Sequence, residues 1–188
     1  MSESMNEIKD KIRQRFVKVA RSPNEKQPFA IGPDSAKKLG YSLAEIDGLP
    51  AHVTESFAGV GNPLALGELR AGETVLDFGC GAGMDSIIAA RRVGPSGEVI
   101  GGDMIEEMVT KAKDNTVAAG VTNAVFHQSE ADRLPVGDGT VDVVISNGVF
   151  NLCLDKPKVV AEIFRVLRPG GRVQMADIFL GENVTPGE

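Results

Sequence analysis

The stretch from Glu73 to Asp103 limits most strongly how this chain can fold. It begins with a short apolar run, continues through the glycine-rich sequence GCGAG, and then shows apolar residues at helical spacing. A turn, GPSG, separates the helical segment from a second apolar run that stops at Asp103. The predicted order is a strand over Thr74 to Phe78, a loop over Gly79 to Gly83, a helix over Met84 to Val93 and a strand over Glu98 to Gly102.

This strand-loop-helix-strand unit is typical of a nucleotide site. Glycines let the backbone turn tightly and let a ligand lie against it, and the first turn of the helix offers free N–H groups. A carboxylate at the tip of the second strand, here Asp103, can accept hydrogen bonds from both hydroxyls of a ribose. The pattern therefore predicts an adenosine-containing ligand, although a purely structural glycine turn remains the alternative.

The glycine spacing separates two classes of ligand. A dinucleotide loop has the pattern G-x-G-x-x-G, in which the third glycine permits close packing of helix on strand. Gly79 and Gly81 fit that pattern, but Met84 occupies the third position and Gly83 comes one residue early. The loop is G-x-G-x-G with an acid, Asp77, two residues before it, which disfavours an NAD-dependent oxidoreductase.

Composition excludes several other classes. The 188 residues carry a net charge of −6, and the pI of about 5.1 argues against an electrostatic grip on nucleic acid or an anionic membrane. Cys80 and Cys153 are too few for a disulfide scaffold, and His52 and His127 show no metal-ligand spacing. No signal peptide or membrane-spanning run is recognised, so we expect a cytoplasmic protein without a metal site.

The first 70 residues predict short helices rather than a second core. Residues 5–20 have apolar side chains at helical spacing, and two short helices are expected near 35–39 and 42–49. Ser42 and Glu45 have the spacing of a capping box, and residues 64–66 predict a brief further helix. Residues 1–70 hold few large apolar side chains, so we expect a helical lid leading into one core domain over residues 71–188.

Strands and helices continue to alternate after Asp103. This alternation predicts an α/β fold with a doubly wound, mostly parallel sheet, helices on both faces and a ligand at the carboxyl ends of the strands. The expected elements are a helix over 105–119, a strand over 124–127, a strand over Val141 to Ser146, a helix over Lys158 to Leu167, a turn over Pro169 to Gly171 and a strand over Arg172 to Phe179.

Four stretches together carry a family resemblance. GETVLDFGCGAG, VIGGDMIEEMVTKA, LPVGDGTVDVVISNGVFNL and EIFRVLRPGGRVQMADI resemble the Rossmann-like class I S-adenosylmethionine-dependent methyltransferases, and most of all the arsenite methyltransferase family. The resemblance implies S-adenosylmethionine as cofactor. It also implies that the loop accommodates the amino-acid end of that cofactor, with Asp77 facing the ammonium group.

The resemblance assigns further roles residue by residue. Asp103 would bind the ribose, Met104 would pack on the adenine, Glu130 and Ala131 would meet the adenine edge, and Asn147 would contact the methionine part. Each has a plainer alternative: a solvated acid for Asp103 or Glu130, core packing for Met104, and a turn residue for Asn147. The predicted cofactor-binding set is Phe16, Asp77, Gly79, Cys80, Gly81, Gly83, Asp103, Met104, Glu130, Ala131 and Asn147.

The chain also departs from that family. The family's arsenic-binding cysteines fall at Val60 and Gly148, and As(III) prefers sulfur ligands, so arsenite is not the expected acceptor. Phe16 stands where the family has a tyrosine over the cofactor; it can still cover the site without the hydroxyl. The two further strands of the usual seven-stranded sheet are not found, so a second copy is expected to cover the open edge, or the fold is a shortened version.

Two functions remain open. The first is a methyltransferase that acts on a small-molecule acceptor by direct in-line transfer, which requires positioning and desolvation but no protein nucleophile. The second is a non-catalytic or partner-dependent cofactor-binding module. No catalytic residue is predicted, because His52 is better explained as a surface histidine than as a general base.

Overall fold

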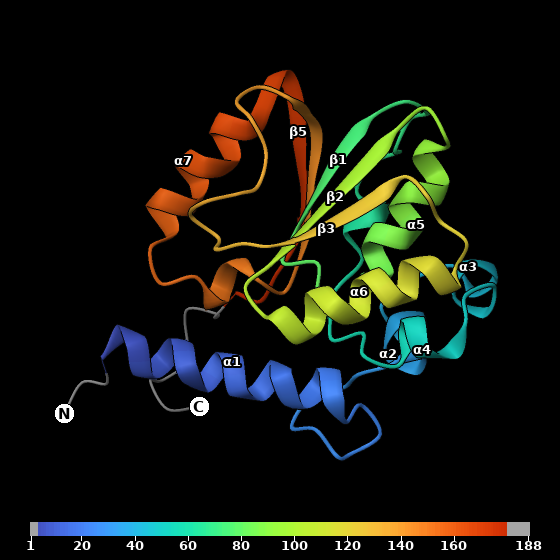
Figure 1. Cartoon of the computed structure of the whole chain (residues 1–188), viewed down its shortest axis with the longest axis vertical. Helices are drawn as coiled ribbons and strands as arrows, with labels where there is room; N and C mark the ends of the chain where they lie inside the picture. Colours follow the sequence, from blue (N-terminus) through green and yellow to red (C-terminus); the bar gives the residue numbers. More distant parts are fainter. Residues whose placement is uncertain (1–3, 180–188) are drawn as a thin grey trace.

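A five-stranded, all-parallel sheet with the order β3-β2-β1-β4-β5 forms the centre of the molecule (Figure 1). The computed structural model describes residues 4–179. The order reverses between β1 and β4, which is the point where ligands bind in open sheets of this type. The strands are β1 (Thr74–Phe78), β2 (Glu98–Asp103), β3 (Ala124–Gln128), β4 (Val141–Asn147) and β5 (Leu167–Ala176).

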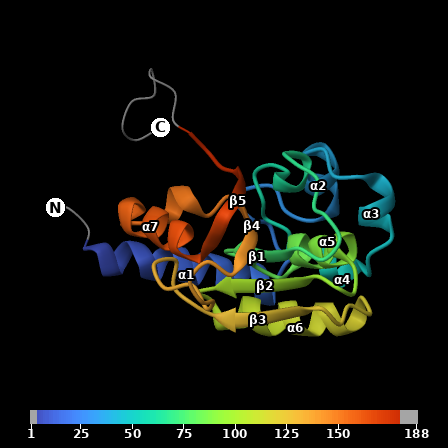
Figure 2. The ribbon, with the colours of Figure 1, turned by 90° about the horizontal axis from the view of Figure 1, so that it is seen from above.

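Helices cover both faces of the sheet, as predicted (Figure 2). Helices α5 (Met84–Val93) and α6 (Glu106–Ala118) pack on one face, and α7 (Lys156–Val166) packs on the other. Val75 and Val143 of the sheet lie in one buried cluster with α5, whereas Leu76 and Val144 lie in another with α7. The near-continuous apolar run of each central strand follows from this burial on two faces.

The N-terminal residues do not form a core of their own. They contain α1 (Met5–Arg21), α2 (Pro33–Lys38), α3 (Leu43–Asp47), α4 (Ala51–Thr54) and the 3-10 helix η1 (Pro63–Ala65). Ala36, Tyr41, Ile46 and Phe57 belong to the same buried cluster as α5 and β1. Helix α1 runs across the molecule beside α6 (Figure 1), so this segment is folded onto the sheet domain.

Two local predictions need correction. Ser42 precedes α3 but makes no side-chain cap, and the side chain of Glu45, the other half of the predicted box, forms an ion pair with Arg92. The capping box of this chain lies at Ser4 and Glu7, at the start of α1.

The last strand also differs from its prediction. Strand β5 begins at Leu167 rather than at Arg172. Leu167 pairs with Val141 of β4, and the next residue of β5 that pairs with β4 is Arg172. The predicted turn residues between them lie inside the strand but have no partners in β4. It ends at Ala176 and not at Phe179. Within residues 4–179, no helix is both long enough and apolar enough to cross a membrane.

Candidate functional site

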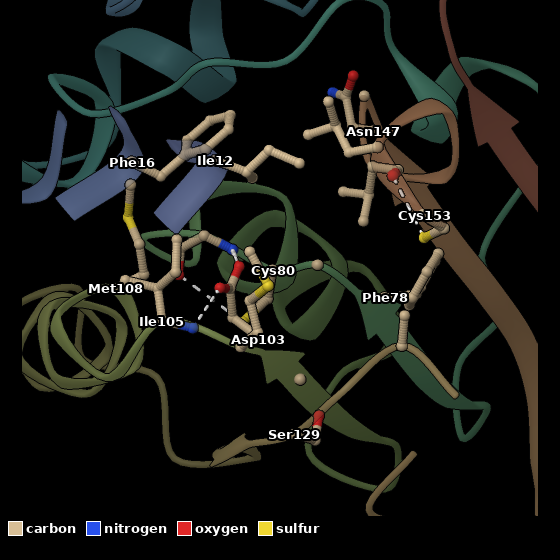
Figure 3. Close-up of a pocket in the computed structure, with 18 of the residues that line it drawn as sticks. Ile12, Phe16, Phe78, Cys80, Asp103, Ile105, Met108, Ser129, Asn147 and Cys153 are labelled. Carbon is tan, nitrogen blue, oxygen red and sulfur yellow. Dashed lines mark hydrogen bonds between the residues drawn. The ribbon is translucent and has the colours of Figure 1, made fainter. Parts of the chain in front are cut away.

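A cavity of about 410 Å³ lies over the carboxyl ends of β1, β2 and β4. Its size is that of a pocket for a nucleoside-sized ligand. In Figure 3, Ile12 and Phe16 lie on the α1 side of the cavity, and Asn147 and Cys153 lie on the β4 side. Ten of the eleven predicted cofactor-binding residues line this cavity; Gly83 is the exception.

The glycine loop holds its shape through backbone conformations that favour glycine. Gly79 has φ +75°, and a Cβ added there would lie 2.3 Å from a methyl group of Val149. Gly81 has φ +51°, and a Cβ added there would meet no atom within 4 Å. Its backbone is therefore exposed to the cavity. Gly83 is the N-cap of α5, with φ +86°, and packs on Ala112 of α6, so it does not line the cavity.

Asp103 ties the loop to the end of β2. Its Oδ2 accepts the N–H of Gly81 at 2.9 Å, and its Oδ1 accepts the N–H of Ile105 at 2.9 Å. The carboxylate also lines the cavity (Figure 3). Each carboxylate oxygen can accept more than one hydrogen bond, so both remain able to accept from a ligand hydroxyl.

A buried polar network lies beneath the loop. Asp77 of β1, only 3% exposed, accepts the hydroxyl of Ser86 at 2.5 Å. Asp85 of α5, 8% exposed, accepts the hydroxyl of Tyr41 at 2.5 Å and the amide of Asn147 at 3.1 Å. Desolvation, followed by the nearby Asp85, raises the pKa of Asp77 to about 8, and desolvation also raises the pKa of Asp85.

Asn147 connects this network to the N-terminal segment. Its Oδ1 accepts the N–H groups of Val60 at 2.8 Å and Gly61 at 3.1 Å, and its Nδ2 donates to the carbonyl of Gly61 at 2.9 Å. It also donates to the hydroxyl of Tyr41 at 3.0 Å. Asn147 therefore holds the loop around Gly61 over the end of β4. The alternative of a simple turn residue does not account for these contacts.

The region beyond β2 and β3 forms another wall. Met104, Ser129, Glu130 and Ala131 line the cavity there. Glu130 forms an ion pair with Lys9 of α1, with Nζ and Oε2 2.7 Å apart. Met104 also packs beside a buried cluster that includes residues of α1. It therefore contributes to core packing and lines the cavity at the same time.

Helix α1 covers part of the cavity on the side away from the strand ends (Figure 3). Phe16 lines it and also contacts Phe29, with 5.9 Å between ring centroids. Ile12 lines it one turn earlier. The predicted general-base candidate His52 is exposed and does not line the cavity, in agreement with the surface interpretation.

The two thiols are held in the neutral form. Desolvation raises the pKa of Cys80 well above its usual range and raises the pKa of Cys153 to about 11. The two positions where the resemblance places cysteines are neighbours, since a Cβ on Gly148 would lie 3.2 Å from a methyl group of Val60. A valine side chain thus occupies the place where that thiol pair would meet.

Three residues that the prediction of the site left out matter most to its geometry. Ile12 was recognised only as part of an amphipathic helix. Asp85 follows Met84 within the helix, and Tyr41 lies 44 residues before Asp85, so no local pattern joins them. Tyr41 is the only tyrosine of the chain, and that is the one signal that could have drawn attention to it.

The residues present fit S-adenosylmethionine. The cavity combines a bare glycine backbone, one carboxylate at the tip of β2 and two buried carboxyls near the loop, which suits a ligand with a ribose and a cationic end. Comparison with known families supports this: a model described as a methyltransferase domain matches residues 69–185.

Individual relatives are consistent with the family match. An arsenite methyltransferase from Halobacterium salinarum is 45% identical over 143 residues, which cover 76% of this chain and 36% of the relative. A ubiquinone/menaquinone biosynthesis C-methyltransferase from Saccharophagus degradans is 35% identical, covering 64% of this chain and 49% of the relative. The chain thus spans about a third to a half of the length of these curated relatives.

Solved structures show the same fold. An arsenic(III) S-adenosylmethionine methyltransferase from Chlamydomonas reinhardtii has a TM-score of 0.65 at 38% identity, covering 71% of this chain and 47% of that one. A SAM-dependent methyltransferase from Aquifex aeolicus has a TM-score of 0.60 at 26% identity, covering 84% and 79%. This chain therefore belongs to the class I S-adenosylmethionine-dependent methyltransferases, near their arsenite methyltransferase-like members.

Proposed function

We propose that this protein transfers a methyl group from S-adenosylmethionine to a small-molecule acceptor by direct in-line displacement. The observation that carries the proposal is the position of α1 over part of the cavity. Strand ends form the floor, while Phe16 and Ile12 of α1 lie on the opposite side and leave the cavity half open (Figure 3). A recessed cavity of about 410 Å³ suits small reactants better than a macromolecular surface.

The protein's part in this reaction is to position the reactants and exclude water. The bound cofactor supplies an electrophilic methyl group, so no protein nucleophile is needed. Asp103 and the glycine loop would hold the nucleoside, and Asn147 keeps the loop around Gly61 in place beside them. Residues 4–70 act as a lid in this proposal, because α1 covers the cavity while α2 to α4 share the core of the sheet domain.

The acceptor that we propose is not arsenite. Both cysteines of the chain are held as neutral thiols, and As(III) binds thiolates. Val60 and Gly148 fill the region where the family's cysteines would lie, and neither has a sulfur atom. Phe78, Val149 and Leu152 line the same side of the cavity, which favours an acceptor with an apolar body.

A methyl-transfer assay tests the proposal. We expect labelled methyl groups to reach at least one apolar small molecule in a panel that includes precursors of ubiquinone and menaquinone together with arsenite, to which the relatives' names point. Arsenite should remain unmethylated. Methylation of arsenite would contradict the acceptor proposal. Binding of the cofactor without transfer to any acceptor would favour the non-catalytic module.

The assay needs a control for folding. Asp142 is a buried aspartate at the amino end of β4, where it accepts the N–H of Thr74 at 2.7 Å, far along the strand from Asn147. An Asp142→Asn variant should keep its activity, whereas Asp103→Ala should lose most of it at limiting cofactor. Equal losses in both variants would indicate a general folding defect and would remove this support for the site.

A further inference from the structure

Two buried carboxyls border the cavity without a cation bonded to them. Asp77 and Asp85 come from different elements, β1 and α5, and both line the cavity. Among the described residues, the groups that bond to them are Ser86, Tyr41 and Asn147, all of which are neutral. Two ionised carboxylates in this position would be costly, since burial disfavours charge and like charges repel.

The charged groups around the pair do not relieve this cost. Asp103 on β2 adds a further negative charge and raises the pKa of Asp77. Arg92, on α5, lowers the pKa of Asp85, but its guanidinium is bonded to Glu45 at 2.9 and 3.0 Å. The other titratable neighbours, Cys80 and Tyr41, have raised pKa values and stay neutral.

We propose that Asp77 and Asp85 form a two-carboxyl subsite that holds one proton while the cavity is empty and releases it when the ammonium group of the cofactor's amino-acid end enters. The proposal rests on the cofactor assignment and does not depend on methyl transfer. The exchange balances at the subsite: the ammonium of the zwitterionic amino-acid end enters beside the carboxyls, the O–H bond of the carboxyl of Asp77 breaks, and the proton passes to the buffer. Tyr41 is the positioning residue that orients Asp85.

The geometry explains why Asp77 carries the proton. Asp85 accepts two hydrogen bonds, from Tyr41 at 2.5 Å and from Asn147 at 3.1 Å, and both bonds favour its ionised form. Within residues 4–179, Asp77 accepts hydrogen bonds from Ser86 alone. Both Asp85 and Asp103 raise its pKa, whereas Arg92 lowers the pKa of Asp85. The pKa of Asp77, about 8, keeps most of this group protonated at pH 7.

Calorimetry of the full chain measures the proton directly. Titration with S-adenosylhomocysteine in buffers of different ionisation enthalpy gives the number of protons released per ligand bound. At pH 7 we expect about 0.9 proton, the protonated fraction of a group whose pKa is about 8. S-adenosylmethionine should give nearly the same number, since both ligands carry the ammonium group.

A truncated ligand serves as the first control. 5′-Methylthioadenosine keeps the nucleoside and the thioether but lacks the amino-acid end, so its binding should release close to no protons. Three results would overturn the proposal: equal release with this truncated ligand, no release with S-adenosylhomocysteine, or no binding of either cofactor form. None of these measurements requires a methyl acceptor. A failure of the proposed methyl transfer can therefore be distinguished from a failure of the proposed proton release.

Variants identify the residues. Asp77→Asn should bring proton release close to zero, because the variant lacks the carboxyl that carries the proton and removes the like charge beside Asp85. Asp142→Asn, which changes a buried aspartate at the other end of the sheet, should release the same number of protons as the unmodified protein. Unchanged release in Asp77→Asn would assign the proton elsewhere and overturn the proposal.

Tyr41→Phe separates positioning from packing. The phenylalanine keeps the ring but removes the hydroxyl that lowers the pKa of Asp85, so Asp85 also becomes partly protonated in the empty cavity. Proton release at pH 7 should therefore rise above that of the unmodified protein while affinity falls. A loss of affinity with an unchanged proton number would show that Tyr41 acts through packing alone, which contradicts its assigned role.

Discussion

Replacing Asp103 with alanine tests the assignment of the ribose. The carboxylate lies at the tip of β2, accepts two backbone N–H groups at 2.9 Å, and keeps acceptor capacity toward the cavity. Its loss would leave two ribose hydroxyls without acceptors in a covered site. We expect binding to weaken by about 2–3 kcal/mol, or about 30- to 160-fold in Kd.

The same substitution also frees the N–H of Gly81, so a loop effect must be separated from a ribose effect. Isothermal titration with 2′-deoxy and 3′-deoxy S-adenosylhomocysteine makes this separation. In the unmodified protein each missing hydroxyl should cost about 1–1.5 kcal/mol, whereas in Asp103→Ala it should cost almost nothing. Unchanged affinity in the variant, or equal losses in both proteins, would refute the ribose assignment.

Further substitutions test the glycine loop at Gly79, the hydrogen bonds of Asn147 and the buried carboxyl of Asp77. Gly79→Ala should lower Tm by about 4–10 °C, because its Cβ would lie 2.3 Å from Val149 at a φ of +75°; a melt unchanged within error would contradict the loop geometry. Asn147→Ala should destabilise the fold by about 2–3 kcal/mol in denaturant titrations, since it leaves the N–H groups of Val60 and Gly61 without their acceptor. A loss of less than about 0.5 kcal/mol in the free energy of unfolding, which is typical of a surface substitution, would argue against these hydrogen bonds. The pKa of Asp77 is raised from 3.8 to about 8. Between these two pH values the folded chain therefore binds more protons than the unfolded chain. The stability that this group contributes is lost as the pH rises from about 4 to about 8. Asp77→Asn should therefore flatten the fall of Tm between pH 5 and 8, and an unaltered profile would remove the buried-acid interpretation.

The central sheet could be predicted closely because its signals are local. Strand β1 and helix α5 begin and end at the predicted residues, since burial on both faces gives each strand an apolar run and glycines mark where each ends. The same glycines and Asp103 located the cavity. Gly83 does not line the cavity, because its positive φ serves the start of α5 and its packing on α6.

Interactions between distant segments explain what the sequence could not show. The Tyr41 hydroxyl meets Asp85 across 44 residues, and Asn147 meets Gly61 across 86. Neither contact leaves a periodic or compositional trace. The predicted capping box at Ser42 is absent, and its Glu45 side chain instead pairs with Arg92 of α5, a contact that the local sequence does not reveal.

A crystal structure of the chain with S-adenosylhomocysteine tests the central claim most directly. We predict that the ligand occupies the cavity over Gly79 and Gly81, with both ribose hydroxyls within hydrogen-bonding distance of Asp103 and the ammonium facing Asp77 and Asp85. A ligand bound elsewhere, or one whose ribose turns away from Asp103, would contradict the account.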